Sequence, residues 1–509
     1  MQKVSCPSCG AEVAFRSAAS VMAVCEYCHS TLLKDAESVK DIGKMADVLE
    51  DYSPIQINTS GEYQSKHFTV VGRIQLRYDD GFWNEWYVLF DDGTGAWLSD
   101  ASGQYVFTLP QRSGSNVPKF EALKPGVGLT LSGSRFVASD VRTAQCLAGQ
   151  GELPFKVGPG WQAKVADFRS GNRFVTLDYS DGETPQLYIG QSVDLTGLRC
   201  QLLRSETDIA QTAGKYRGKT AVLNCPNCGS AINYQAGMAV NVVCPSCNAQ
   251  VDCAGDKAVV LQKHEQLARV ITTLALGDFG TIDGIKYQVI GFTKCNEIGS
   301  DGTSQWIEYL LFNDKRGFLW LVESQDRWDR VKVLDEWPEQ RSATTVDLRG
   351  AAYNKLYQYG AEVVYAAGAF NWRVTVGDRT RIIDYARDTS KLTAESSDSE
   401  IVWSVATQVS DAQVRQWFAK KTMPGTGSLA SQHAAAEPVD LSALKTATII
   451  ASVILAVINL PISFTHDDED ILVTMIGLGV LWIPFWFQNR ANGGDSSDDS
   501  DDSDSGGDD

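Results

Sequence analysis

Cys225-Pro226-Asn227-Cys228-Gly229 is followed by Cys244-Pro245-Ser246-Cys247, with fifteen residues between Cys228 and Cys244. The chain opens with the same arrangement, Cys6-Pro7-Ser8-Cys9-Gly10 and then Cys25-Glu26-Tyr27-Cys28, again fifteen residues apart. Each cysteine of the opening arrangement lies 219 positions before its counterpart. The constant offset predicts two copies of one unit, each beginning with a pair of Cys-x-x-Cys turns.

A Cys-x-x-Cys turn places two sulfur atoms on one side of a tight loop, so two such turns can surround one ion with four thiolates. Four sulfur ligands in a tetrahedron favour zinc, with iron next. Four thiolates also leave no open position for water or substrate, so we predict two structural Zn²⁺ sites without catalytic activity. The predicted ligands are Cys6, Cys9, Cys25, Cys28, Cys225, Cys228, Cys244 and Cys247.

Redox-active disulfides are the alternative for these cysteines, because thioredoxin-like proteins also carry Cys-x-x-Cys. Those proteins place a single motif at a strand-to-helix junction, whereas neither pair here precedes a helical pattern. The other four of the twelve cysteines share no spacing, and we interpret them as small core residues.

Composition and charge narrow the functional classes. With 509 residues and 43% hydrophobic content, the chain is long enough for several domains with substantial cores. Its net charge of −18 argues against nucleic acid as a partner, although zinc ribbons bind nucleic acid in other proteins, so this alternative stays open. No signal-peptide pattern precedes the first cysteine pair, and thiolate sites suit a reducing compartment, so we expect the soluble part in the cytosol.

Strand patterns follow each cysteine unit. The runs 67–74 and 83–90 flank Asp79-Asp80-Gly81, which is a hairpin signal, and the second copy repeats them from 287 and from 306. Trp97-Leu98 corresponds in the same way to Trp320-Leu321, 223 positions later. Both copies therefore contain a whole β domain, which we expect to be an antiparallel β-sandwich or β-barrel.

The cysteine unit followed by a β domain with Trp-x-Glu-Trp/Tyr and a downstream Trp-Leu resembles the bacterial family called domain of unknown function 4178. The resemblance covers 52–216 and 268–418. The family has no established activity, so the resemblance implies no catalytic residue. It does imply a protein partner similar to phage-shock protein A, a membrane-remodelling coat, because family members tend to be encoded near such proteins.

Acidic and aromatic side chains recur at equivalent positions of the two copies. The repeated acids are Glu85, Glu308, Asp167 and Asp384. They are candidates for binding carboxylates, but we interpret them as strand-surface acids or turn formers, because Asp is common in turns. The repeated aromatic pairs are Trp83 with Trp306 and Trp86 with Tyr309, which we interpret as core and cross-strand contacts rather than a ligand platform.

Two segments near the C-terminal end, 441–464 and 471–488, are apolar, with Lys445 as their only charged residue. A helix of about 20 apolar residues crosses the hydrocarbon core of a bilayer, and Trp482 and Trp486 suit its interface. We predict a two-helix transmembrane hairpin. The alternative, an amphipathic hairpin on the membrane surface, requires a polar face that neither segment has.

Charges around this hairpin predict its orientation. Lys420, Lys421 and Lys445 precede or begin the first helix and Arg490 follows the second, whereas the loop 466–470 carries four acids and no base. Basic residues favour the cytoplasmic side. We therefore expect an integral protein of the bacterial inner membrane with the soluble domains and both termini in the cytoplasm.

The predicted fold class is mainly β: two zinc ribbons and two repeated antiparallel β domains, plus the C-terminal transmembrane α-hairpin. The predicted order is ribbon 1–34, helical connector 35–51, β domain 52–216, ribbon 221–256, helical connector 257–269, β domain 270–420, linker 421–440, helices 441–464 and 471–488, and a disordered acidic tail 489–509.

The function that we predict is binding or scaffolding at the bacterial inner membrane. The alternative is an enzyme, a hydrolase or transferase with a carboxylate site in the β domains. A convergent cluster of the repeated acids in one deep cleft would favour the enzyme, and an exposed apolar or aromatic strip without such a cluster would favour the scaffold. No catalytic residue and no organic cofactor are predicted.

Overall fold

A computed structural model describes residues 2–34, 39–46, 48–112, 117–158, 161–212, 223–232, 241–252, 259–262, 270–299, 304–325 and 327–420. The predicted linker, transmembrane helices and acidic tail, 421–509, lie outside these residues, as does part of the second helical connector. In the described part of the chain, no helix has the length and apolar character needed to span a membrane.

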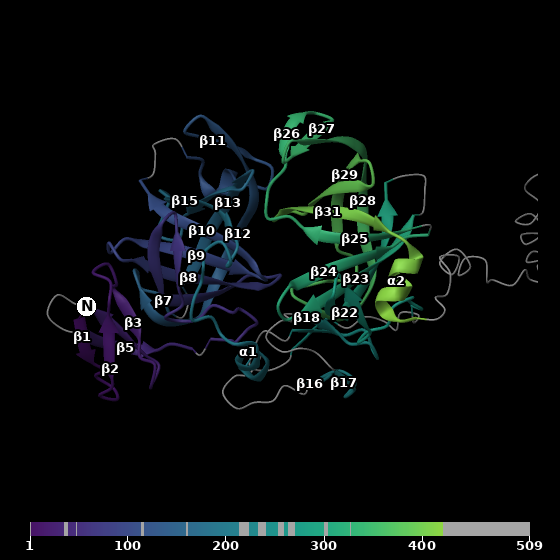
Figure 1. Cartoon of the computed structure of the whole chain (residues 1–509). Coiled ribbons are helices and arrows are strands. Elements are labelled where there is room, and N and C mark those ends of the chain that lie inside the picture. Colours follow the sequence, from purple (N-terminus) through teal and green to yellow (C-terminus); the bar gives the residue numbers. More distant parts are fainter. Residues whose placement is uncertain are drawn as a thin grey trace, which may run out of the picture. The chain divides into compact units, whose positions relative to one another are not determined.

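Eight antiparallel strands of the first copy close into a barrel, called the first barrel below (Figure 1). Their order is β12-β13-β14-β15-β10-β9-β8-β7, and pairing of β7 with β12 completes the ring. The strands are β7 (Lys66–Arg77), β8 (Phe82–Phe90), β9 (Gly95–Ala101), β10 (Gln104–Gln111), β12 (Ser134–Leu153), β13 (Gln162–Ser170), β14 (Arg173–Asp178) and β15 (Gln186–Val193). β6 (Ser60–Tyr63) pairs with β7, and β11 (Gly128–Leu131) with β12.

The second copy forms a second barrel with the same strand order, β28-β29-β30-β31-β25-β24-β23-β22, closed by pairing of β22 with β28. The strands are β22 (Ile285–Ile298), β23 (Gln305–Asn313), β24 (Gly317–Glu323), β25 (Trp328–Val333), β28 (Ala351–Phe370), β29 (Arg379–Arg387), β30 (Ser390–Ser396) and β31 (Ile401–Val409). β21 (Phe279–Ile282), β26 (Glu339–Ser342) and β27 (Thr345–Leu348) extend it. Of the two expected architectures, the barrel is therefore the one observed.

A glycine pair lies at the closing seam of each barrel. Gly151 on β12 is opposite Gly72 on β7, and Gly368 on β28 is opposite Gly291 on β22. A Cβ atom on Gly72 would lie 1.8 Å from a carbonyl oxygen of the facing strand, and one on Gly368 would lie 2.3 Å from another. Such distances are far below contact, so only glycine lets the two strands approach here.

Each ribbon adds its hairpin strands to the sheet of its own barrel. In the first ribbon β1 (Gln2–Ser5) pairs with β2 (Glu12–Phe15), and β3 (Met22–Val24), β4 (Ser30–Lys34) and β5 (Val39–Lys44) join the barrel through β12. The second ribbon does the same with β16 (Leu223–Asn224), β17 (Ala231–Ile232), β18 (Asn241–Val243), β19 (Gln250–Asp252) and β20 (Val259–Gln262), through β28. Ribbon and barrel thus share one hydrogen-bonded sheet in each copy.

The predicted helical connectors are wrong where the structure describes them. Residues 39–44 form strand β5 and residues 259–262 form strand β20. Strand β5 pairs with the open edge of β4, and this pairing satisfies backbone groups of both strands. The helix was predicted from the spacing of Ile42, Met45, Val48 and Leu49; the last three are buried in the irregular segment that follows β5, whereas Ile42 is exposed on β5.

Buried side chains fill both the interior and the outer walls of the barrels. In the first barrel one cluster lies inside, around Ile74 and Trp97, and two lie outside, around Trp86 and around Phe168. Trp86 is 1% exposed and its counterpart Tyr309 is 0% exposed. The prediction that this aromatic pair serves core contacts is confirmed.

Two short α-helices were not predicted from the strand pattern: α1 (Glu206–Thr212) follows the first barrel and α2 (Asp411–Phe418) follows the second. A single 3₁₀ turn, η1 (Phe120–Ala122), precedes β11. Ser410 begins α2 with a capping box to Gln413, and Phe418 lies against Gly280 of β21. The second helix therefore covers one edge of the second barrel.

Candidate metal centres and barrel interiors

The Cys-x-x-Cys turns owe their shape to backbone hydrogen bonds. In the first ribbon the amides of Gly10 and His29 donate to the carbonyls of Cys6 and Cys25 at 2.8 and 2.9 Å. Gly10 and His29 adopt positive φ angles of 78° and 58°, which tight turns require. The second ribbon repeats both bonds at the equivalent positions. His29 therefore shapes a turn beside the cysteine quartet and is not one of its four members.

The eight predicted ligands assemble into two quartets, one per ribbon. Within each quartet the four Sγ atoms lie within 4.8 Å of one another. Their closest Sγ–Sγ distances are 3.6 and 3.7 Å in the first ribbon and 3.7 and 3.8 Å in the second. A tetrahedron with metal–sulfur bonds of about 2.3 Å has edges of about 3.8 Å, so both quartets fit a tetrahedral metal ion. A disulfide bond is about 2.05 Å long, and the described cysteines form none.

Glu85 of β8 lies on the inner face of the first barrel and lines a cavity that residues of both barrels border. Its carboxylate accepts hydrogen bonds from Trp83 Nε1 at 2.8 Å and from Ser99 Oγ at 2.7 Å. Residues two apart on a strand point to the same face, so the Trp-x-Glu spacing places the indole N–H beside the carboxylate. The repeated motif thus encodes a specific hydrogen bond.

The second barrel builds the same arrangement around Glu308. Trp306 Nε1 donates to its carboxylate at 2.7 Å, and Thr293 Oγ1 donates at 3.3 Å. The second hydroxyl comes from β22 here, whereas in the first barrel Ser99 provides it from β9; the residue equivalent to Ser99 is Val322. The hydroxyl group that donates to the glutamate therefore comes from the strand on one side in the first barrel and from the strand on the other side in the second.

The second repeated acid is also held by a hydroxyl. Thr176 Oγ1 donates to Asp167 at 2.7 Å in the first barrel, and Thr393 Oγ1 donates to Asp384 at 2.6 Å in the second. In the second barrel Lys391 Nζ adds an ion pair to Asp384 at 3.1 Å. Asp384 is 0% exposed. The interpretation of the repeated acids as strand-surface or turn residues is therefore wrong, because their side chains lie on the inner faces of the barrel strands.

A third acid in each barrel, Asp178 on β14 and Glu395 on β30, was not predicted from the sequence. Asp178 lies opposite Val165 and Glu395 opposite Ile382, at equivalent registers. The offset of 217 that links Asp167 to Asp384 also links Asp178 to Glu395, so extending the repeat along the strand would have found the pair.

A family model described as Domain of unknown function (DUF4178) matches residues 56–195 and 275–411, more than half of the chain. The chain belongs to this family. The two matches cover the two barrels, and they confirm the resemblance inferred from the Trp-x-Glu and Trp-Leu motifs. No curated protein matches the chain.

The interior of the first DUF4178 domain holds a carboxyl group that titrates near neutral pH. Burial raises the pKa of Glu85 to about 7; hydrogen bonds from Ser99 and Trp83 oppose this shift, and the charges of Asp167 and Asp178 add to it. Burial also raises the pKa of Asp167 and of Asp178. These three carboxyl groups therefore influence one another.

The second DUF4178 domain shows the same effect at a different residue. Desolvation raises the pKa of Glu395 to about 8 although its side chain is exposed to the cavity that it lines; the charges of Glu308 and Asp384 add to the shift, and Lys391 opposes it. Burial raises the pKa of Glu308 as well. The interior acids do not converge tightly enough to form a metal site, since in the described part of the chain only the cysteine quartets bring three or more ligand atoms within 4.8 Å.

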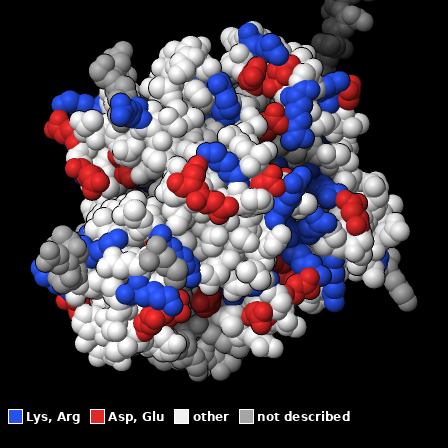
Figure 2. Space-filling model, turned by 60° about the vertical axis from the view of Figure 1, so that its left-hand side comes forward, with Lys and Arg blue, Asp and Glu red and all other residues white. Residues whose placement is uncertain are grey.

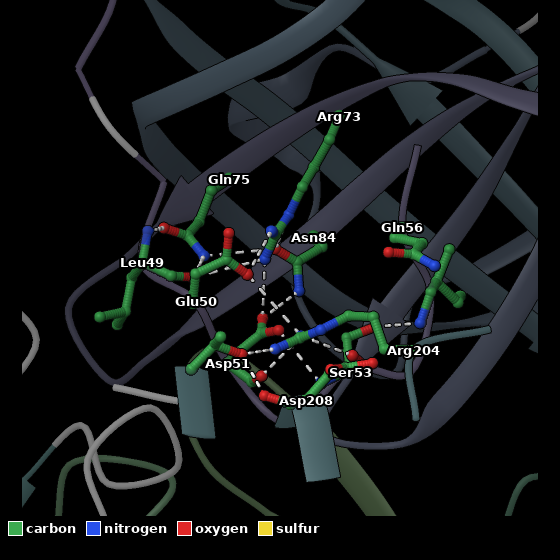
Figure 3. Close-up of polar contacts among 12 residues, drawn as sticks. Leu49, Glu50, Asp51, Ser53, Gln56, Arg73, Gln75, Asn84, Arg204 and Asp208 are labelled. Carbon is green, nitrogen blue, oxygen red and sulfur yellow. Dashed lines mark hydrogen bonds and ion pairs between the residues drawn. The ribbon is translucent and has the colours of Figure 1, made fainter. Parts of the chain in front are cut away.

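A separate polar network anchors the segment that enters the first DUF4178 domain (Figure 3). Arg73 is 2% exposed, its Nη2 lies 3.0 Å from Asp51 Oδ2, and its Nε donates to Asn84 Oδ1 at 2.9 Å. Gln75 Nε2 donates to the carbonyl of Leu49 at 3.0 Å. The buried charges are thus paired and hydrogen-bonded, which is the condition for tolerating them inside a protein. This network is structural.

Proposed function

We propose that the chain is a zinc-ribbon binding and scaffold protein of the bacterial inner membrane, with one Zn²⁺ in each cysteine quartet. The observation that carries this proposal is the closed geometry of the quartets, since four sulfur atoms at tetrahedral spacing fill the coordination sphere. Closed zinc sites stabilise structure and leave no position for a reacting water. Because each ribbon extends the sheet of a barrel, the metal would hold a binding domain in shape.

The membrane part of the proposal rests on the apolar segments 441–464 and 471–488 and on the charges that flank them. A protein partner similar to phage-shock protein A would then meet the soluble domains at the cytoplasmic surface. Tyr27, between the two cysteines of the second turn, is 74% exposed and is a candidate contact, because exposed aromatic side chains commonly anchor protein interfaces. The equivalent residue in the second ribbon is Ser246.

Cysteine accessibility in spheroplasts tests the membrane topology. In the full chain, Asp468→Cys should react with a membrane-impermeant thiol reagent, whereas Ser497→Cys should not. The unsubstituted chain is the control for its own cysteines. The opposite labelling would invert the topology, and labelling of neither would indicate a hairpin that returns to the same side.

A second experiment tests the protein partner and uses the difference between Tyr27 of the first ribbon and Ser246 of the second. A purified protein similar to phage-shock protein A should bind the full chain in detergent, and Tyr27→Ser, which copies the second ribbon, should weaken this binding. Equal binding by both proteins would remove Tyr27 from the interface, and no binding by either would remove this partner.

A carboxylate enzyme is the second candidate, and the convergence of acids inside each barrel favours it. A carboxyl group with a pKa of about 7, such as that of Glu85, suits general acid catalysis at neutral pH. The hydrogen bonds that Glu85 and Glu308 already accept favour a binding role instead. Recovery of a bound compound unchanged would support binding, whereas turnover lost in Glu85→Gln or Glu308→Gln would support the enzyme.

Surface charge gives little support to nucleic-acid binding. Figure 2 shows one face of the molecule, on which Lys and Arg side chains gather on the right and Asp and Glu side chains border them. Carboxylates beside a basic run repel a phosphate backbone. With a net charge of −18 as well, the scaffold remains the better supported function.

A further inference from the structure

The two barrels differ at one interior position opposite the repeated threonine. In the first barrel Thr176 lies opposite Tyr188 of β15, and in the second barrel Thr393 lies opposite Ser404 of β31. Tyr188 packs within the interior cluster of the first barrel. A serine at the equivalent place means that the second barrel lacks the aromatic ring at this position.

The hydroxyl of Ser404 is buried and points into this interior. Ser404 is 5% exposed, lines the cavity, and its Oγ has no hydrogen-bond partner among the described residues. Residues directly opposite each other on neighbouring strands point to the same face of the sheet. Ser404 therefore points to the same inner face as Thr393, which donates a hydrogen bond to Asp384. Because buried polar atoms are almost always hydrogen-bonded, this hydroxyl marks a place for a ligand group.

The interior of the second barrel also holds more acidic than basic side chains. Glu308, Asp384 and Glu395 face one base, Lys391, which is paired with Asp384. The carboxyl group of Glu395 lines the cavity, and no described side chain or amide donates a hydrogen bond to it.

The first barrel is better balanced. Its Asp178 accepts a hydrogen bond from the Ser180 amide at 2.8 Å, and the charges of Arg142 and Arg169 both act on Asp167. Spare acceptors and an excess of acidic over basic side chains are therefore features of the second barrel.

We propose that the interior of the second barrel binds a small organic cation, a protonated amine, whose ammonium group is held by Glu395, Glu308 and the Oγ of Ser404. An ammonium group has three N–H donors and no acceptor, which matches two carboxylates and a hydroxyl. Glu308 keeps this capacity because each carboxylate oxygen can accept two hydrogen bonds. Trp306 and Trp320 line the same cavity and offer ring faces to a cation. This ligand site goes beyond the scaffold function and does not depend on it.

The proposal predicts a characteristic pH dependence. The titratable groups around Glu395 are Glu308 on β23, Asp384 on β29, Lys391 on β30, Glu400 beside β31, Tyr359 on β28 and Cys295 on β22. Burial raises the pKa values of Tyr359 and Cys295 far above neutrality, so both stay uncharged. With a pKa of about 8, Glu395 gains its charge as the pH rises from 6 to 9, so a cation should bind more tightly over that range.

Calorimetry on the purified full chain, with benzylammonium as probe and benzyl alcohol as its neutral analogue, tests the proposal. Benzylammonium should bind, with an affinity that increases about tenfold per pH unit below pH 8 and then levels off. Benzyl alcohol should bind at least about tenfold more weakly at pH 8. Equal, pH-independent binding of both probes would overturn the proposal, as would no benzylammonium binding at about 10 mM.

Matched variants locate the site. Glu395→Gln keeps the shape and should weaken benzylammonium binding about tenfold or more, whereas Asp178→Asn at the equivalent position of the first barrel should leave it unchanged. Ser404→Tyr, which copies the first barrel, should block binding. If circular dichroism shows that Ser404→Tyr does not fold, the isosteric variant Glu395→Gln provides the test. Unchanged benzylammonium binding by Glu395→Gln would contradict the proposal.

Discussion

The first and second barrels have the same strand order but different chemistry at equivalent positions of their walls. Arg73 and Asn84 form part of a buried polar network in the first barrel. At the equivalent places the second barrel has Phe292 and Ile307, and the Phe292 ring stacks on Tyr365 with 5.7 Å between centroids. A satisfied ion pair and an apolar contact are both stable solutions inside a protein. The shared fold therefore depends on strand pairing and the glycine seam more than on the polarity of this wall.

The interiors of the two barrels also differ in the polarity of residues at equivalent positions. The first barrel places Tyr188 and Phe174 where the second has Ser404 and Lys391. The wall is thus more polar in the first barrel. At these two interior positions the second barrel is the more polar one, whereas Arg142 of the first barrel corresponds to Tyr359 of the second. The proposed amine site uses the hydroxyl of Ser404, at a place where the first barrel has the ring of Tyr188.

Removal of metal should have the largest effect on stability. The two ribbons should respond independently, because each has its own site. A structural zinc site stabilises a small fold by about 10–16 kcal/mol at neutral pH, so a chelator should unfold both ribbons. Elemental analysis should give two Zn²⁺ per chain, and Cys225→Ser should give one. Iron in place of zinc, or loss of both ions in Cys225→Ser, would contradict two independent zinc sites.

Substitutions in the outer wall should have the next largest effect on the free energy of unfolding, and this effect should differ between the two barrels. Arg73→Leu leaves the Asp51 carboxylate buried without its ion pair and should lower the free energy of unfolding by about 3–5 kcal/mol. Phe292→Leu, at the equivalent position of the second barrel, conserves apolar character and should cost less than about 1.5 kcal/mol. Urea denaturation of the full chain measures both values. Similar losses would show that the two walls are not energetically different.

The interior acids predict how stability changes with pH. The pKa values of Glu85, about 7, and Glu395, about 8, lie above the ordinary value of 4.5, so the folded state retains protons that the unfolded state releases. Stability should therefore fall as the pH rises from about 4.5 to 8. Glu85→Gln and Glu395→Gln should each flatten this fall, up to pH 7 and pH 8 respectively.

Denaturation midpoints at pH 5, 6, 7 and 8 measure this effect. The metal sites titrate alike in the unsubstituted chain and the variants, so the difference between them isolates the acid. Parallel curves for a variant and the unsubstituted chain would show that its carboxyl group has an ordinary pKa.

Sequence patterns predicted the parts of this protein whose chemistry depends on local spacing. The cysteine quartets and the repeated Trp-x-Glu motif follow from residues a few positions apart, so they could be found without a fold. The position of Glu85 inside a barrel could not, because alternation separates the two faces of a strand but does not say which faces inward when both are buried. The strand at 39–44 was missed because its side chains are mostly exposed and polar, so no apolar alternation marks it, and only its pairing with β4 identifies it.

Exchange of the hydroxyl donors should have the smallest effect and tests the equivalence of the two barrels most directly. Ser99→Val removes one hydrogen bond from Glu85 and should cost about 1–2 kcal/mol while raising the pKa of Glu85 further, because that bond favours the charged form. Adding Ile74→Thr copies the second barrel, in which Thr293 provides the bond from β22. The double variant should recover most of the lost stability and return the pKa of Glu85 toward 7, as measured by urea denaturation and by NMR titration of its side chain. A double variant no more stable than Ser99→Val alone would mean that the two barrels hold their glutamates by mechanisms that cannot be exchanged.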